Sequence, residues 1–508
     1  MPPMRRRLQL GFDAAPERVR AAVERAANVE PEVETGVVVD GRRSTVELTL
    51  ATDLRVPYFG WFFHPLLRRE LSRRLAHLAA NIRAELDTTP APGPYRPSRV
   101  LPPVPFTQDQ IRLIATVSAL AALANFGGAL FGQYGAPIAD SFGTSDAELG
   151  AGLALTRLGI LVALFSTAFA DRRGRRRLIL VCFAGVAVSN GISALAPGFA
   201  FFVGPQVLTR ALTTATLVVA GIAVVEEAPE RARAYSVALL ALASGAGFAI
   251  AIVLLPLADL GSHAWRIPFL VSGATLLVLR PLARHLVETT RYHALETRHA
   301  ERGRVREVFD RLYRMRFLLL ALVAFLTNVF SAPTAQLTNR YLIEERDFSN
   351  TMIAVFRGVT NGLPGLFGIL LAGYLAERSG RRPLAIAALA AGTIFEMVLF
   401  LGGGPVIWVA STVGIVAAAC AGLAISTLSG ELFPTEVRAT SNAILLVCGV
   451  AGAIVGLLVA TNLEGAVGSL GAGIAVCGIA PLLAAAFVLP WLPETKDRTL
   501  DTVSPSEV

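Results

Sequence analysis

Twelve apolar stretches follow one another between residues 108 and 492 of this 508-residue chain. Each is close to the roughly 20 residues that an α-helix needs to cross about 30 Å of hydrocarbon. Charged residues make up 17% of the chain and the mean hydropathy is +0.57, whereas soluble proteins carry about 25% charged residues. The chain is therefore predicted to be an all-α integral membrane protein with a polar N-terminal region.

We predict one membrane-spanning helix for each stretch, arranged as two bundles of six. The predicted spans are residues 111–135, 148–170, 178–197, 200–225, 235–258, 265–283, 316–341, 351–376, 383–402, 406–429, 439–461 and 469–492. The N-terminal bundle covers residues 108–283 and the C-terminal bundle residues 316–492. Between them, residues 284–315 are dense in Arg, Glu and His and are predicted to form a cytoplasmic central loop, and residues 493–508 a cytoplasmic tail.

Residues 1–89 are predicted to form a small soluble or membrane-surface segment. The stretch VRAAVERAANV has helical periodicity, and STVELTLATDL alternates like a strand. A helix further along places five apolar residues on one face: Leu67, Leu71, Leu75, Leu78 and Ile82. That helix either covers its own sheet in an α+β domain or lies on the membrane beside the aromatic stretch VPYFGWFF. Residues 90–107 are proline-rich and predict a semi-rigid linker.

The net charge of +8 is distributed over short loops between apolar stretches, which does not favour nucleic-acid binding. Loops after the even-numbered helices contain DRRGRRR, PERARA, ERSGRR, PTEVRA and PETKDR, whereas the alternate loops, such as ADSFGTSDAE, carry acids. Since basic loops stay on the cytoplasmic side, both termini are predicted to be cytoplasmic, in a multi-pass protein of the inner (plasma) membrane.

The sequence contains no pattern that indicates an enzyme. Its four cysteines, Cys182, Cys420, Cys448 and Cys477, lie in apolar segments without metal or redox spacing. We find no phosphate loop and no nucleophile triad, and therefore expect no catalytic residues, no metal and no cofactor. The first 25 residues are charged and lack the apolar core of a signal peptide.

The two bundles carry the same loop motifs at nearly the same separation. ADRRGRR recurs as AERSGRR, with Asp171 and Glu377 separated by 206 residues. EEAPERARA and GELFPTEVRA share a pattern that aligns Glu226 with Glu431, 205 residues later. Glu288 and Glu494 repeat the 206-residue separation after the sixth and twelfth helices. These pairs predict an internal duplication.

Parallel six-helix repeats with a basic central loop are typical of one transporter fold. The motif Gly373-x-x-x-Glu377-Arg378-x-Gly380-Arg381-Arg382, and its first-half copy from Asp171 to Arg176, resemble the loop signature of the major facilitator superfamily. PETKDRTL, ELFPTEVRA and FGGALFG resemble its sugar-porter branch, but Gln133-Tyr134 stands where that branch often has a Tyr-Asp pair. The seventh helix lacks the paired glutamines expected for sugar, and the tenth lacks the expected tryptophan.

The resemblance implies a gating charge network that links the halves when the protein opens outward and breaks when it opens inward. Its predicted members are Asp171, Arg172, Gly174, Arg175, Glu226, Arg233, Glu288, Gly373, Glu377, Arg378, Gly380, Arg381, Glu431, Arg438 and Glu494.

Four charged residues fall well inside the predicted spans, away from their ends, where charge is costly and suggests function. We expect Arg210 to line the central cavity, Arg157 and Arg357 to lie near the outer boundary, and Glu396 to have a structural partner or a boundary position rather than to carry a proton. Polar residues that could bind a solute, or equally join helices, are Asn125, Gln133, Gln206, Asn328, Gln336 and Asn361.

The sequence as a whole predicts a secondary active or facilitative transporter. It would move a small polar solute, sugar-like or carboxylate, by alternating access, and protons are a candidate coupling ion for symport. Two or more arginines at membrane depth favour an anionic solute. The alternatives are a multidrug efflux transporter and a non-transporting sensor with a regulatory N-terminal segment.

Overall fold

The computed structural model describes residues 4–12, 15–29, 33–40, 43–52, 56–87, 89–90, 92–95, 98, 102, 104, 106–163, 174–286, 311–433 and 435–495. The chain divides into two compact units, each considered by itself. The first contains Met1–Ala119, Val224–Leu240 and His285–Val287, and the second contains the remainder.

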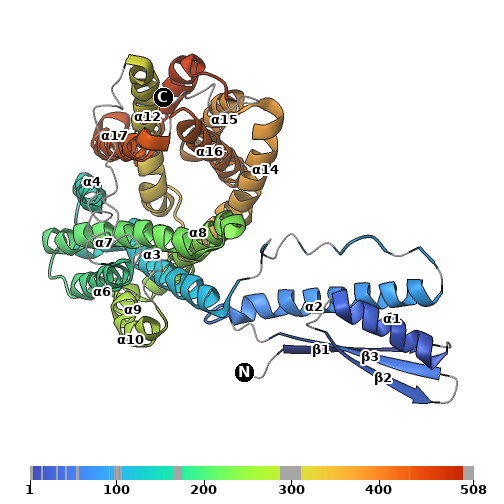
Figure 1. Cartoon of the computed structure of the whole chain (residues 1–508). Coiled ribbons are helices and arrows are strands. Elements are labelled where there is room, and N and C mark those ends of the chain that lie inside the picture. The colour runs from blue at the N-terminus through green and yellow to red at the C-terminus, as the bar shows by residue number, and fades with distance from the viewer. Residues whose placement is uncertain are drawn as a thin grey trace. The chain divides into compact units, whose positions relative to one another are not determined.

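The N-terminal residues form a three-stranded antiparallel sheet with two helices on one face (Figure 1). Its strands are β1 (Met4–Phe12), β2 (Val33–Asp40) and β3 (Arg43–Thr52), in the order β1-β3-β2, and its helices are α1 (Pro16–Val29) and α2 (Gly60–Leu86).

The apolar face of α2 packs against this sheet. Leu71, Leu75, Leu78 and Ile82 share one buried core with alternate residues of β3, whose period of two sends every second side chain to the same face. The α+β alternative is therefore the arrangement found, and the membrane-surface alternative is wrong for these four side chains.

Eleven helices in the described part of the chain are long and apolar enough to cross a membrane. The longer helices, in chain order, are α3 (Gln108–Phe142), α4 (Asp146–Ala163), α6 (Arg175–Ala194), α7 (Phe199–Glu227), α8 (Arg233–Val253), α9 (Arg266–Ala274), α10 (Leu276–His285), α12 (Arg311–Glu344), α13 (Asn350–Arg357), α14 (Leu363–Ser379), α15 (Arg381–Leu401), α16 (Val406–Glu431), α17 (Thr435–Asn462) and α19 (Leu470–Cys477). Short helical turns complete them: η1 (Glu230–Ala232), η2 (Leu255–Leu260), η4 (Gly358–Gly362), α18 (Glu464–Val467), α20 (Ile479–Leu483), η5 (Ala484–Val488) and η6 (Leu489–Trp491).

These helices occupy the predicted spans. The remaining span, residues 148–170, corresponds to α4 up to Ala163, and its last residues lie outside the described part. Most of the predicted central loop, and the tail after residue 495, lie outside it as well. Large apolar side chains such as Leu277 (82% exposed) and Leu363 (80% exposed) point away from the protein core, as expected where lipid replaces water. The chain is a multi-pass membrane protein.

Glycines let the first helix of each half approach the fifth. A Cβ atom on Gly247 of α8 would overlap the carbonyl oxygen of Ala122 in α3. The same holds in the second half, where Gly452 of α17 lies against the carbonyl oxygen of Phe325 in α12. This repeated backbone contact fixes α3 and α12, which carry the residues that join the two halves.

Candidate solute site and gates

The two halves touch at equivalent positions of their first helices. The Asn339 side chain of α12 donates through Nδ2 to the Gln133 carbonyl oxygen of α3 at 2.8 Å, and to the Gln133 Oε1 atom at 3.3 Å. These residues are separated by 206 residues, the offset of the repeated loops. Pro137 stands four residues after Gln133 and has no N–H, so the helix leaves that carbonyl without its usual donor. Asn339 supplies the missing donor from the other half.

A cavity of about 200 Å³ lies beside this contact. Residues of α3, α4, α7, α8 and α12 line it, namely Gly128, Ala129, Phe131, Gly132, Gln133, Leu153, Thr156, Arg157, Gln206, Thr209, Arg210, Phe248, Ala335 and Gln336. Four predicted solute-binding residues are thus brought together: Gln133, Gln206, Arg210 and Gln336. Arg157 lines the cavity too, so its side chain points inward instead of extending to the boundary. The membrane depth of a residue follows from the helix, but the direction of its side chain requires the packing.

The polar side chains of the cavity differ in how many hydrogen-bond partners they have. The Gln206 amide nitrogen donates to Ser193 Oγ at 2.8 Å and to Asn190 Oδ1 at 3.1 Å, which holds it within its own half. When the Gln336 amide is turned to present its oxygen, it accepts from Arg157 Nε at 3.0 Å, across the halves. Arg210 Nε is buried and has no hydrogen-bond partner among the described residues.

The other three polar candidates contact backbone or neighbouring hydroxyl groups instead of lining the cavity. Asn125 donates to the Ser244 carbonyl oxygen at 2.8 Å, which joins α3 to α8. Asn328 donates to the Ala324 carbonyl oxygen of its own helix at 2.9 Å. Asn361 accepts from Thr360 Oγ1 at 2.9 Å. The alternative of joining helices fits Asn125, and also Asn361, which accepts from Ser411 of α16 at 3.4 Å, whereas the bond of Asn328 stays within α12.

Arg357 is buried within the C-terminal half, so its side chain does not extend to the solvent at the boundary. Its side chain is close to fully enclosed, at 7% exposure, and its Nε atom donates to Asn339 Oδ1 at 2.9 Å. It therefore orients the same Asn339 side chain that contacts Gln133.

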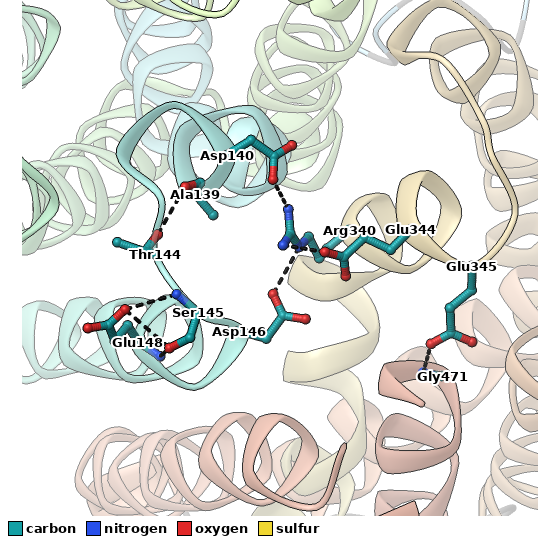
Figure 2. Close-up of polar contacts among 10 residues, drawn as sticks. All are labelled: Ala139, Asp140, Thr144, Ser145, Asp146, Glu148, Arg340, Glu344, Glu345 and Gly471. Atoms are coloured by element: carbon teal, nitrogen blue, oxygen red, sulfur yellow. Dashed lines mark hydrogen bonds and ion pairs between the residues drawn. The ribbon is translucent and has the colours of Figure 1, made fainter. Parts of the chain in front are cut away.

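A second junction lies where α3 ends and α4 begins, which we call the Asp140 side. Figure 2 shows Arg340 of α12 between Asp140 and Asp146 of the N-terminal half, with Glu344 on its own helix. Its Nε atom lies 2.9 Å from Asp146 Oδ1, and the pair is largely buried, with side-chain exposures of 10% and 8%. None of these four residues was predicted as part of a site.

Asp259 of η2 adds a further contact between the halves on the Asp140 side. Its carboxylate accepts from the backbone N–H of Thr351 at 2.9 Å and that of Asn350 at 3.1 Å. It also accepts from both side chains at 2.8 Å. The Asp259 carboxylate thus accepts hydrogen bonds from N–H groups that have no partner within α13. The start of a helix also stabilises its negative charge.

On the opposite side, the glycines at equivalent positions of the two repeated loop motifs have the same backbone conformation. Gly174 and Gly380 have φ values of 85° and 96°, which other residues rarely adopt. Arg176 donates to the Ala283 carbonyl oxygen at 3.1 Å, and its equivalent Arg382 donates to that of Leu492 at 3.1 Å. The duplication thus extends to individual contacts.

The predicted gating residues of the C-terminal half cluster within that half. Arg381 Nη2 lies 3.3 Å from Glu431 Oε1. Glu494 accepts the backbone N–H of Arg381 and of Arg382, each at 3.0 Å, and so caps α15. Arg378 donates to the Tyr374 hydroxyl at 2.7 Å.

Some of the other predicted gating residues lie in the described part of the chain and some lie outside it. Gly373 and Glu377 lie on an exposed part of α14, and Arg175 is buried at the start of α6. Arg233 lies 3.9 Å from Glu230, and Glu226 lies near the end of α7. Asp171, Arg172 and Glu288, and the side chain of Arg438, lie outside the described residues.

Comparison with known proteins gives a consistent result. The family model described as Major Facilitator Superfamily matches residues 113–360, and that described as Sugar (and other) transporter matches residues 290–506. The solved xylose transporter XylE from E. coli, in its inward-open conformation, is 18% identical, with a TM-score of 0.61 over 77% of this chain and 98% of that chain.

Two other solved structures are similar. A bacterial homolog of the human lysosomal transporter Spinster, inward-facing and occupied, is 17% identical, with a TM-score of 0.61 over 76% of this chain and 97% of that chain. The nucleoside transporter NupG is 12% identical, with a TM-score of 0.63 over 74% and 99%. No curated protein matches the chain by sequence.

Proposed function

Because the chain belongs to the major facilitator superfamily and is a transporter of a small solute rather than an enzyme, we propose that it carries a small organic anion through the Arg157–Arg210 cavity. The observation that supports this most directly is the buried Arg210 Nε atom without a described partner. A buried donor without an acceptor costs about 1–3 kcal/mol, and more when it is charged. A carboxylate in the cavity would remove that cost.

The charge balance of the cavity also favours an anion. Arg157 and Arg210 both line it, and the charge of each acts on the other. No Asp or Glu is among the described residues that line it. Like charges in a low-dielectric space repel strongly, and a bound anion would relieve the repulsion. An arginine pair can also grip a carboxylate in a bidentate manner.

Alternating access follows from where the halves touch. If the basic loops are cytoplasmic, the Asp140 side faces outward, and the contacts of Arg340 and Asp259 close the outer entrance. This arrangement corresponds to an inward-facing state, the state in which the solved XylE and Spinster homologue structures are described. The cytoplasmic loop motifs around Gly174 and Gly380 would come together when the outer contacts break.

Exchange in proteoliposomes tests the substrate class. Proteoliposomes that contain the protein are loaded with unlabelled gluconate, succinate or xylose. Uptake of the labelled form of the same compound is then measured without any ion gradient. We expect counterflow of an anion in the parent chain and its loss in Arg210→Gln. The matched control is Arg112→Gln, which removes a solvent-exposed arginine near the start of α3.

A neutral sugar is the second candidate, because the Sugar (and other) transporter model covers the C-terminal half. Xylose counterflow in the parent that persists in Arg210→Gln, with no exchange of gluconate or succinate, would refute the anion proposal and establish the sugar alternative. If none of the three compounds exchanges, the cavity assignment fails for both.

A further inference from the structure

A polar cluster lies within the C-terminal half, away from the cavity. Glu396 of α15 runs across Gly414 of α16, where an added Cβ atom would lie 2.9 Å from Glu396 Cγ. One turn earlier on α16, Ser411 donates at 3.0 Å to Oγ1 of Thr360, a residue of the π-helical turn η4. π-helical turns within α-helices are frequent at functional sites.

Arg357 connects this cluster to the contact between the halves. The charges of Glu396 and Arg357 act on each other, although the carboxylate and guanidinium are not in direct ion-pair contact. Arg357 Nη2 is buried without a hydrogen-bond partner among the described residues, while its Nε atom holds Asn339. Asn339 in turn donates to Gln133 of the other half. The Glu396 charge thus acts on Arg357, which is hydrogen-bonded through Asn339 to the junction of α3 and α12.

We propose that Glu396 is a proton-binding site of the transporter, and that Arg357 and Asn339 transmit its charge state to the contact between the two halves. Ionisable residues at membrane depth are costly to retain and commonly serve as proton relays. This inference rests on the alternating access proposed above, and it would make the transport of the solute depend on protons.

The sign of the coupling follows from the contacts. An ionised Glu396 carboxylate attracts the Arg357 guanidinium and competes with Asn339 Oδ1 for it. A proton taken from solution onto a Glu396 carboxyl oxygen removes that attraction and breaks no covalent bond. Arg357 then stays with Asn339, whose amide remains directed at Gln133. Protonation is therefore expected to stabilise the state in which the Asp140 side is closed.

Other titratable groups surround this path, and a test has to separate them. Arg357 of α13 acts on Glu396 electrostatically. On α19, which packs against α15, Cys477 is titratable, and its thiol donates to the Gly473 and Gly456 carbonyl oxygens. At the Asp140 side, the titratable groups are Asp140, Asp146, Glu344 and Glu464, which surround Arg340.

The test measures the closure of the Asp140 side without any solute. Spin labels go on Ala147→Cys of α4 and Ala466→Cys of α18, two exposed positions on opposite halves, in a chain whose four native cysteines are replaced. Distances between the labels are measured by pulsed electron paramagnetic resonance in lipid nanodiscs at pH 5.5 and pH 8.5. The parent is expected to shift toward the short distance at pH 5.5. Glu396→Gln is expected to show the short distance at both pH values.

Two further variants make the outcome decisive. Glu396→Asp keeps a titratable group and is expected to retain the pH-dependent shift, even if Glu396→Gln does not fold. Glu464→Gln removes a carboxyl of the Asp140 side and is expected to leave most of the shift in place. A Glu396→Gln distribution that moves with pH as much as the parent, or loss of the shift in Glu464→Gln alone, would overturn the proposal. Because no solute is used, this result is independent of the counterflow assay.

Discussion

Replacing Arg340 with glutamine tests whether the Asp140 side is a gate. Arg340 bonds to Asp140 and Asp146 across the halves, whereas its bond to Glu344 lies within α12. Only the first two bonds depend on closure. Arg340→Gln should therefore weaken the closed state of this side and leave the helix itself in place.

The size of the effect follows from the two bonds between the halves. A hydrogen bond to a charged group contributes about 1.5–3 kcal/mol. The Asp146 bond is largely buried and keeps this value, but the Asp140 side chain is 56% exposed, so its bond contributes about 0–1 kcal/mol. The sum is about 1.5–4 kcal/mol, which changes the ratio of closed to open molecules by roughly 10- to 1,000-fold.

The label pair at positions 147 and 466 measures this ratio directly. We expect the short-distance population to fall sharply in Arg340→Gln at pH 7. The matched control is Arg346→Gln, because Arg346 contacts Tyr341 and Gly402 within the C-terminal half only. An unchanged distribution in Arg340→Gln, or an equal change in Arg346→Gln, would show that these ion pairs do not hold the side closed.

Three other predictions concern packing and pH. Gly150→Leu should open the Asp140 side in the same distance measurement, because its side chain would overlap Thr461 of α17, whereas Gly204→Ala, in open space, should not. Burial and Asp146 raise the pKa of Glu464, so ionisation at higher pH destabilises the fold; the melting temperature of Glu464→Gln should exceed that of the parent at pH 8, with a smaller difference at pH 5. Leu75→Ala, at 3% exposure, should destabilise the N-terminal domain by about 2–5 kcal/mol and increase its cleavage in limited proteolysis.

The helices could be predicted from the sequence because membrane crossing needs a long apolar stretch and basic loops mark the cytoplasmic side. The helix register in the first domain was also accessible, since Leu71 and Leu75 are four residues apart on one face. The internal repeat could be predicted because Gly174 and Gly380 recur at equivalent positions of the two halves. Their positive φ values favour glycine at both positions.

The contacts between the halves could not be predicted in the same way. Arg340 lies 200 residues from Asp140 and 194 from Asp146, and a charge at the end of a helix is unremarkable in sequence. The inward direction of the Arg157 side chain is not predictable either, because a position along a helix gives the depth of a residue and not the direction of its side chain. The sequence does contain one indication of the contact between Gln133 and Asn339. The 206-residue offset of the repeat aligns these two residues, and Pro137 leaves the Gln133 carbonyl oxygen without a donor in its own helix.

The bond between Asn339 and the Gln133 backbone makes the link between the halves largely independent of the side chain at position 133. Asn339 holds the main-chain oxygen of Gln133 at 2.8 Å, and every amino acid has such an oxygen. The side chain at position 133 lines the cavity, and its exchange would remove the 3.3 Å contact to Oε1 but leave the bond to the main-chain oxygen. If the cavity binds the cargo as proposed, selectivity can diverge among descendants of this chain while the joint between the halves is inherited intact, provided that the proline at position 137 is kept.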